Sequence, residues 1–267
     1  MTRVPRLVRR RELWLPTIWG WALIAGVVAG AGWLGVHHVY GFLAPNQPVN
    51  RGLLVVEGWV NDAALAEAAR LWRTGAYTRL VTTGGPIERY ASLFPSDNYA
   101  ASAAETLEKE GIQAAEIAVV PAPPSNRERT FASAIALREW LARNRVDERE
   151  MDVLSEGPHA RRTWILYRAA FGANVTIGIR SVTSDLYSPV AWWQSSAGAK
   201  DVLTEAIAWL WVKCCFHVYP SKSPTESDPT GTGGRDVGLE GDRAPHSRSV
   251  LGVRRATAAP EDARPRR

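Results

Sequence analysis

The sequence predicts an α/β fold: a Rossmann-like three-layer α/β/α domain with a mainly parallel five-stranded sheet, preceded by one transmembrane helix. Three observations predict it. Short apolar runs alternate regularly with longer helical segments over residues 52–217, which is typical of a parallel sheet covered by helices on both faces. An uncharged apolar stretch precedes this region. At 46% hydrophobic and 22% charged residues the 267-residue chain is not disordered as a whole, and two Cys exclude a disulfide scaffold.

The net charge of +5 is unevenly distributed along the chain. Residues 1–12 hold five Arg and one Glu, and residues 220–267 hold nine Lys or Arg and seven Asp or Glu. The region between them therefore holds 18 basic and 19 acidic residues, so the folded part is nearly neutral. Without a basic stripe interleaved with aromatic residues, we expect no nucleic-acid partner.

The apolar stretch from Trp14 to Val36 contains no charged residue. As a helix it would be roughly 34 Å long, enough to cross a bilayer core of about 30 Å. The Arg-rich segment 1–13 precedes it, which predicts a cytoplasmic N-terminus and a domain on the other side of the membrane. A signal peptide cleaved near Ala29-Gly30-Ala31 is the alternative, but the apolar run continues past that site and favours a retained anchor with a linker, together residues 14–43. A buried soluble helix is a weaker third interpretation.

Five apolar runs rich in β-branched residues predict the strands, at 53–56, 80–82, 117–120, 152–155 and 175–179. Helices are expected at about 61–74, 98–110, 125–144, 160–171 and 195–216. Ser125 and Glu128 are spaced as a capping box for the third of these helices. In the last helix an apolar stripe contains Leu203, Ile207, Leu210 and Cys214. Cys214 and Cys215 are adjacent, which disfavours a bond between them and leaves them core-facing or free. The Pro- and Gly-rich tail 220–267 is predicted to be disordered.

Polar residues follow the predicted strands at one edge of the sheet, where ligands bind in open parallel sheets. Glu57 and His159 are candidate acid/base groups. Candidate ligand-binding residues are Gly58, Thr83, Gly84, Gly85, Thr130, Ser133, Arg161 and Arg162. Gly58 and the pair Gly84-Gly85 allow close backbone approach, and the two Arg suit a phosphate or carboxylate.

Each of these signals has an ordinary alternative. Gly84-Gly85 is often a tight turn, Glu57 can cap a helix, Thr130 and Ser133 are common near helix starts, and Arg161 can pair with Glu156 at the surface. Four polar strand exits at one edge together favour a site. No Rossmann fingerprint, Walker loop or Gly-x-Ser-x-Gly elbow is present, so we expect no cofactor. The five His are scattered, so we expect no metal.

At these residues the chain resembles the ElyC/SanA/YdcF proteins. The resemblance covers residues 52–216 and includes Val55-Val56-Glu57-Gly58-Trp59, Thr83-Gly84-Gly85, Arg129-Thr130-Phe131-Ala132-Ser133-Ala134, and His159 followed by Arg162. The chain departs from many members at Ala132 and Ser133, where they have Glu and Asn, and at Glu57, where their first turn is Gly-rich. The resemblance implies a Rossmann-like fold and, for membrane-anchored members, a role in envelope integrity and peptidoglycan or lipid-carrier metabolism.

These observations predict a single-pass protein of the cytoplasmic (inner) membrane, with its N-terminus inside and its α/β domain on the periplasmic or extracellular side. The expected ligand is an anionic glycan, or a lipid-linked or phosphorylated small molecule. Whether the protein is an enzyme stays open. The alternative is a non-catalytic envelope scaffold or ligand-binding module, with envelope protein partners recruited by Tyr187, Trp192, Trp193 and the tail.

Overall fold

The computed structural model describes residues 15–87, 96–125 and 128–216. The chain divides into two units, 1–219 and 220–267, and all described residues belong to the first. The predictions of a cytoplasmic Arg-rich segment and of a disordered tail lie outside the described residues.

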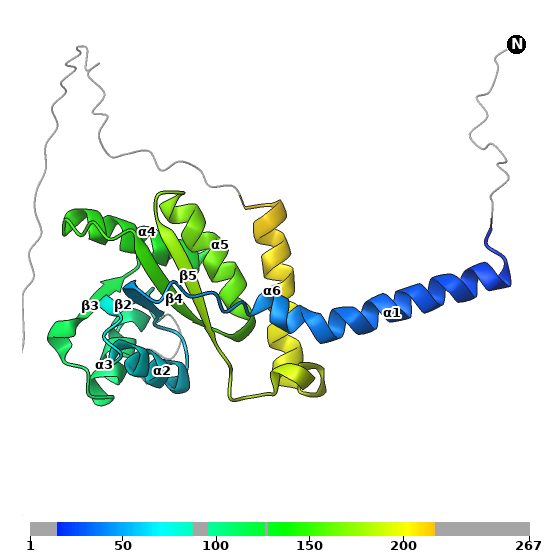
Figure 1. Ribbon diagram of the computed structural model, residues 1–267, viewed down its shortest axis with the longest axis horizontal. Coiled ribbons are helices and arrows are strands. Elements are labelled where there is room, and N and C mark those ends of the chain that lie inside the picture. The colour runs from blue at the N-terminus through cyan, green and yellow to red at the C-terminus, as the bar shows by residue number, and fades with distance from the viewer. Residues whose placement is uncertain (1–14, 88–95, 126–127, 217–267) are drawn as a thin grey trace, which may run out of the picture. The chain divides into compact units, whose positions relative to one another are not determined.

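A five-stranded parallel sheet forms the centre of the fold, as the sequence predicts (Figure 1). Its spatial order is β3-β2-β1-β4-β5. The strands are β1 (Gly52–Glu57), β2 (Tyr77–Gly84), β3 (Ile117–Pro121), β4 (Glu150–Glu156) and β5 (Thr176–Val182). Most extend beyond the apolar runs, because polar end residues such as Thr78 and Glu150 also join the backbone ladder, which needs no apolar side chain.

Helices cover both faces of the sheet, which completes the three layers. α2 (Asp62–Trp72) and α3 (Tyr99–Lys109) pack on one face, and α4 (Arg129–Arg143) and α5 (Ala160–Phe171) on the other. Along β1 the side chains alternate between the two cores, with Leu53 and Val55 toward α4 and α5, and Leu54 and Val56 toward α2 and α3. Short 3-10 turns lie at Ala114–Glu116 (η2), Gly157–His159 (η3) and Pro189–Gln194 (η4).

The apolar N-terminal stretch forms one helix, α1 (Ile18–Leu43), capped by the side chain of Thr17. It is long and apolar enough to cross a membrane, which gives weak support for a single-pass membrane protein. Its last turns pack against η4 and α6 (Ser196–Cys214), where Leu43 is buried with Trp192 and Val202.

A buried carboxylate joins the linker after α1 to the sheet. Asp152 on β4 is fully buried and accepts hydrogen bonds from the backbone N–H groups of Val49 (2.6 Å) and Asn50 (3.0 Å). The Tyr77 hydroxyl donates to Asp152 at 2.7 Å, and Arg180 forms an ion pair with it at 3.4 Å. This network fixes the path of the chain from α1 into β1.

Two local predictions are wrong. The capping box of Ser125 and Glu128 does not form: α4 begins at Arg129, and Glu128 at its N-cap adopts a left-handed conformation with φ 39° and no side-chain cap. The predicted stripe of Leu203, Ile207 and Leu210 does lie along one side of α6, and this side is exposed, because the opposite side of the helix faces the domain. Cys214 and Cys215 are both exposed and free of a disulfide, so the core-facing alternative is wrong.

Candidate functional site

A cavity of about 520 Å³ opens at the carboxyl ends of the strands. Glu57 closes β1 and His159 follows β4, and these two strands are neighbours at the point where the strand order reverses. This switch point is the usual ligand site of doubly wound sheets. A volume of this size suits a ligand as large as a sugar phosphate.

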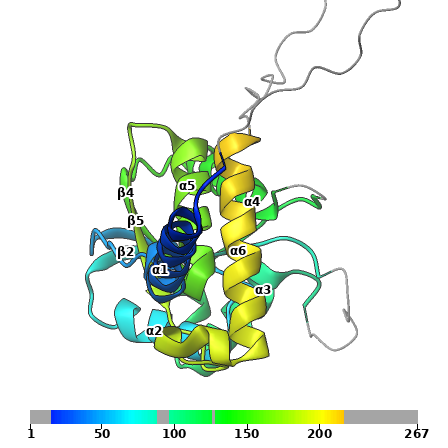
Figure 2. The ribbon, with the colours of Figure 1, turned by 90° about the vertical axis from the view of Figure 1, so that its right-hand side faces the viewer.

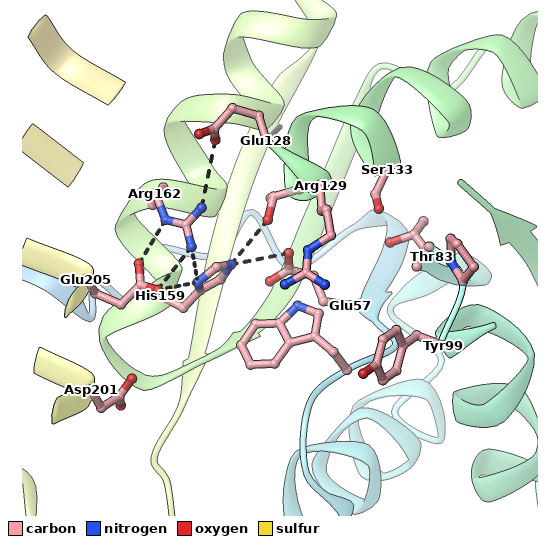
Figure 3. A pocket seen from close by; sticks show the side chains of 15 residues that line it. Glu57, Thr83, Tyr99, Glu128, Arg129, Ser133, His159, Arg162, Asp201 and Glu205 are labelled. Carbon is pink, nitrogen blue, oxygen red and sulfur yellow. Dashed lines mark hydrogen bonds and ion pairs between the residues drawn. The ribbon is translucent and has the colours of Figure 1, made fainter. Parts of the chain in front are cut away.

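His159 lies at the centre of the cavity wall, between two carboxylates (Figure 3). η3 carries the ring to this position after Gly157, whose φ of 47° disfavours other residues. His159 Nδ1 is 2.9 Å from Glu205 Oε1, and its Nε2 is 3.3 Å from Thr130 Oγ1 and 3.8 Å from Glu57 Oε1. Nδ1 also lies 2.9 Å from the Arg162 guanidinium, which only donates, whereas the Glu205 carboxylate only accepts, so the two partners favour opposite states of Nδ1. When a proton on Nδ1 faces Glu205, the Nε2 lone pair is directed toward Thr130 and Glu57.

Glu205, on the buried side of α6, holds His159 in place and was not found by the sequence analysis. Arg162 donates to both Glu205 oxygens, at 2.8 and 3.0 Å, and lies 3.8 Å from Glu128. Burial raises the pKa of Glu205, but hydrogen bonds from His159 and Arg162 outweigh it and hold that pKa at about 2. Glu205 is therefore ionised at neutral pH.

Glu57 and Thr83 lie at the base of the cavity and are almost fully buried. Thr163 donates a hydrogen bond to Glu57 Oε2 at 3.0 Å, which leaves Oε1 directed toward His159. The Thr83 hydroxyl is 3.1 Å from the hydroxyl of Tyr167 in the core. Burial, with the charge of Glu57, raises the pKa of Tyr167, so its hydroxyl stays protonated.

The start of α4 forms the opposite wall. Thr130 and Ser133 are mostly buried there and line the cavity. Arg129 extends into it and makes no hydrogen bond or ion pair with any residue in the described part of the chain. No described side chain caps the α4 N-terminus, so its N–H groups and the Arg129 guanidinium together suit an anion.

Three candidate ligand-binding residues are not placed as the sequence analysis expected. Arg161 leaves the site: its guanidinium lies 4.0 Å from the Phe42 ring centroid and donates to the Phe42 carbonyl, because the end of α1 packs beside α5. Gly58 does not line the cavity, since it lies against the start of α3, where an added Cβ would be 2.3 Å from the Tyr99 carbonyl oxygen. Arg162 lines the cavity, but its charge is balanced by Glu205.

The cavity brings together Glu57, Thr83, Gly84, Gly85, Thr130, Ser133, His159 and Arg162 from the sequence-based list. It adds Trp59, Tyr99, Glu128, Arg129, Asp201 and Glu205, among others. The Trp59 ring packs edge-on against His159, with centroids 4.6 Å apart, and is 40% exposed. A usable signal for α6 was the pair Asp201 and Glu205, two carboxylates one turn apart in the predicted helix.

Four carboxylates and two guanidinium groups line the cavity, so it is not a uniformly basic anion pocket. Negative charge gathers around His159 and Arg162, and the Arg129 side chain reaches in from the α4 wall. This arrangement suits a ligand with a hydroxyl-bearing part and an anionic part. Among the described residues, no group of three or more His, Cys, Asp or Glu is arranged to hold a metal ion.

No protein-family model and no curated protein matches this chain. The resemblance to the ElyC/SanA/YdcF proteins therefore stays a prediction.

Proposed function

We propose that this protein is a membrane-anchored enzyme in which His159, oriented by Glu205, is a general base acting on a phosphorylated or otherwise anionic glycan or lipid intermediate. The observation that carries the proposal is the Glu205–His159–Thr130 arrangement beside Glu57, in a cavity at the switch point. A carboxylate that orients an imidazole, with the second ring nitrogen open toward the cavity, is the relation found in many acid/base sites.

The proposed step is attack of a hydroxyl group, from water or from an acceptor, on the phosphorus of the bound anionic group. Nε2 of His159 takes the hydroxyl proton while the new P–O bond forms and the bond to the leaving oxygen breaks. When water is the attacking group, Glu57 accepts a hydrogen bond from its second O–H and orients it. The imidazolium is stabilised by Glu205 and returns its proton to the leaving oxygen, which balances the step.

Arg129 and the open N–H groups of α4 would hold the oxygens of the anionic group. Trp59, partly exposed beside His159, offers a flat apolar wall against which a sugar ring can pack. Envelope biogenesis as the setting rests on the family resemblance and on the apolar helix α1. The proposed topology, with the domain outside the cytoplasm, rests on the Arg residues that precede α1.

The test is complementation of an envelope defect in cells of the native host that lack the gene. His159→Ala and Glu57→Gln are expected to fail at wild-type protein levels in the membrane. His38→Ala, a histidine exposed on α1, is the matched control and is expected to complement. Full complementation by His159→Ala would favour the non-catalytic scaffold instead.

A further inference from the structure

The outer side of α6 is an apolar surface that no described residue covers. Leu203, Ile207, Leu210 and Trp211 are 55%, 68%, 52% and 45% exposed. Their spacing places them on one side of the helix, whereas Val202, Glu205 and Val212 face the domain and are buried. An exposed patch of large apolar side chains marks an interaction surface.

The same edge of the domain receives the end of α1. The Trp192 indole donates to the Val36 carbonyl at 2.8 Å, and the rings of Phe42 and Trp209 meet edge-to-face with centroids 4.9 Å apart. The preceding part of α1, residues 18–35, is exposed except for Gly20, which is half-buried. Those residues span about 27 Å of helix, close to the bilayer core of about 30 Å. The surface of a membrane crossed by α1 would therefore lie where α1 meets η4 and α6.

α6 lies across the side of the domain from which α1 leaves. In Figure 2, α1 is seen end-on, and α6 runs across the face that is turned to the viewer. The sheet lies behind that face. The apolar surface continues into η4, where Val190 is 81% exposed and Trp193 packs on His37 of α1 with ring centroids 4.8 Å apart. One apolar surface thus joins residues 18–35 of α1, which are long enough to cross the bilayer core, to the outer side of α6.

Charges on α6 divide in the sense expected for a helix at a lipid surface. Lys200 and Lys213 are exposed. Asp201 and Glu205, in contrast, line the cavity on the inner side of the helix. Exposed Lys beside apolar side chains, including Trp, is the pattern of interfacial membrane helices, which bind anionic lipids and bury their apolar side about 5–10 Å deep.

We propose that α6 lies in the interface of the lipid bilayer and holds the domain against the membrane, an inference that rests on α1 being the membrane anchor of the proposed function. Glu205 and Leu203 stand on opposite sides of one helix, so the cavity wall is also the membrane-contacting element. The cavity then lies about one helix diameter from the lipid, which favours a substrate carried on a lipid over one free in solution.

The experiment measures the depth of a fluorescent label in vesicles of phosphatidylcholine and phosphatidylglycerol. The full chain carries Cys214→Ser and Cys215→Ser, plus one new cysteine labelled with an environment-sensitive dye at Ile207→Cys. Lipids with a nitroxide on the upper acyl chain quench the dye. Val27→Cys in α1 is the membrane reference, and Glu108→Cys, exposed on α3, is the aqueous reference.

We expect quenching at position 207 comparable to that at position 27 and several-fold stronger than at position 108. Quenching at 27 with none at 207 would overturn the α6 proposal and leave the anchor intact. A blue-shifted but unquenched dye at 207 would also overturn it, because protein and not lipid would cover the helix. Absence of quenching at 27 would overturn the anchor and the α6 proposal together. None of these readouts depends on His159, so each is separate from the test of catalysis.

Discussion

At the scale of single residues, Glu205 has the largest influence on the site, because it orients His159 and balances the charge of Arg162. Replacing Glu205 by Gln leaves the largely covered Arg162 with the His159 ring and the more distant Glu128 as its partners. We expect Glu205→Gln to lower the free energy of unfolding by about 3–5 kcal/mol, the usual cost of breaking a buried pair. Chemical denaturation measures it, with Glu108→Gln on the surface as a control expected to change little.

The same residue predicts a pH dependence. The folded-state pKa of Glu205 is about 2, below its ordinary value of 4.5. A depressed carboxylate pKa adds stability that is complete above the unfolded-state pKa and is lost as the pH falls toward the folded-state value. We expect the wild-type protein to lose this contribution between pH 4.5 and about 2 and Glu205→Gln to lack it. An equal loss of stability in both proteins over this pH range would contradict the lowered pKa assigned to Glu205.

Arg129 is the cation available to a ligand on the α4 wall. Arg129→Gln is expected to weaken binding of N-acetylglucosamine 1-phosphate by about tenfold or more, since a hydrogen bond to a charged group contributes about 1.5–3 kcal/mol. Titration calorimetry measures it, and Arg143→Gln at the exposed other end of α4 is the matched control. Equal binding by both variants would place the anionic group elsewhere.

At the scale of elements, the start of α3 packs directly on the turn after β1. A Cβ at position 58 would lie 2.3 Å from the Tyr99 carbonyl oxygen, whereas at position 85 it would meet nothing within 4 Å. We expect Gly58→Ala to destabilise the protein by about 1–3 kcal/mol and Gly85→Ala to change stability little. Thermal melts compare the two. Similar melting temperatures for both would contradict the role assigned to Gly58.

The sequence predicted the elements better than the contacts between them. Apolar runs and the Asn61 and Gly75 boundaries place β1 and α2 correctly, because these signals are local. The partner of Arg161, by contrast, lies 119 residues away along the chain. Glu205 lies 46 residues after His159, so no local spacing relates the two. An exposed stripe on α6 and a buried one give the same sequence pattern, so the pattern alone did not show which side of the helix faces the domain.

At the scale of the whole described unit, Asp152 connects the linker after α1 to the sheet. Its carboxylate accepts hydrogen bonds from two backbone N–H groups of the linker and forms an ion pair with Arg180. The carboxylate fits there because residue 178 is Gly, since a Cβ at that position would clash with it. We expect Asp152→Ala to lower the free energy of unfolding by about 3–5 kcal/mol, because Arg180 loses its buried partner. Limited proteolysis is expected to cut the linker near Asn50 faster in this variant. Unchanged cleavage would mean that other contacts hold the linker.

The fold, the cavity and the apolar helix combine into an account in which a membrane-held domain presents His159 to an anionic, lipid-linked substrate. Its central claim is that His159 performs chemistry and does not merely bind. The direct measurement is mass spectrometry of anionic lipids from cells lacking the gene, after incubation with purified full-length protein in vesicles. The account predicts that the wild-type chain converts at least one species and that His159→Ala converts it at least about a hundredfold more slowly. Conversion at the wild-type rate by His159→Ala, or no conversion by the wild-type chain, would contradict it.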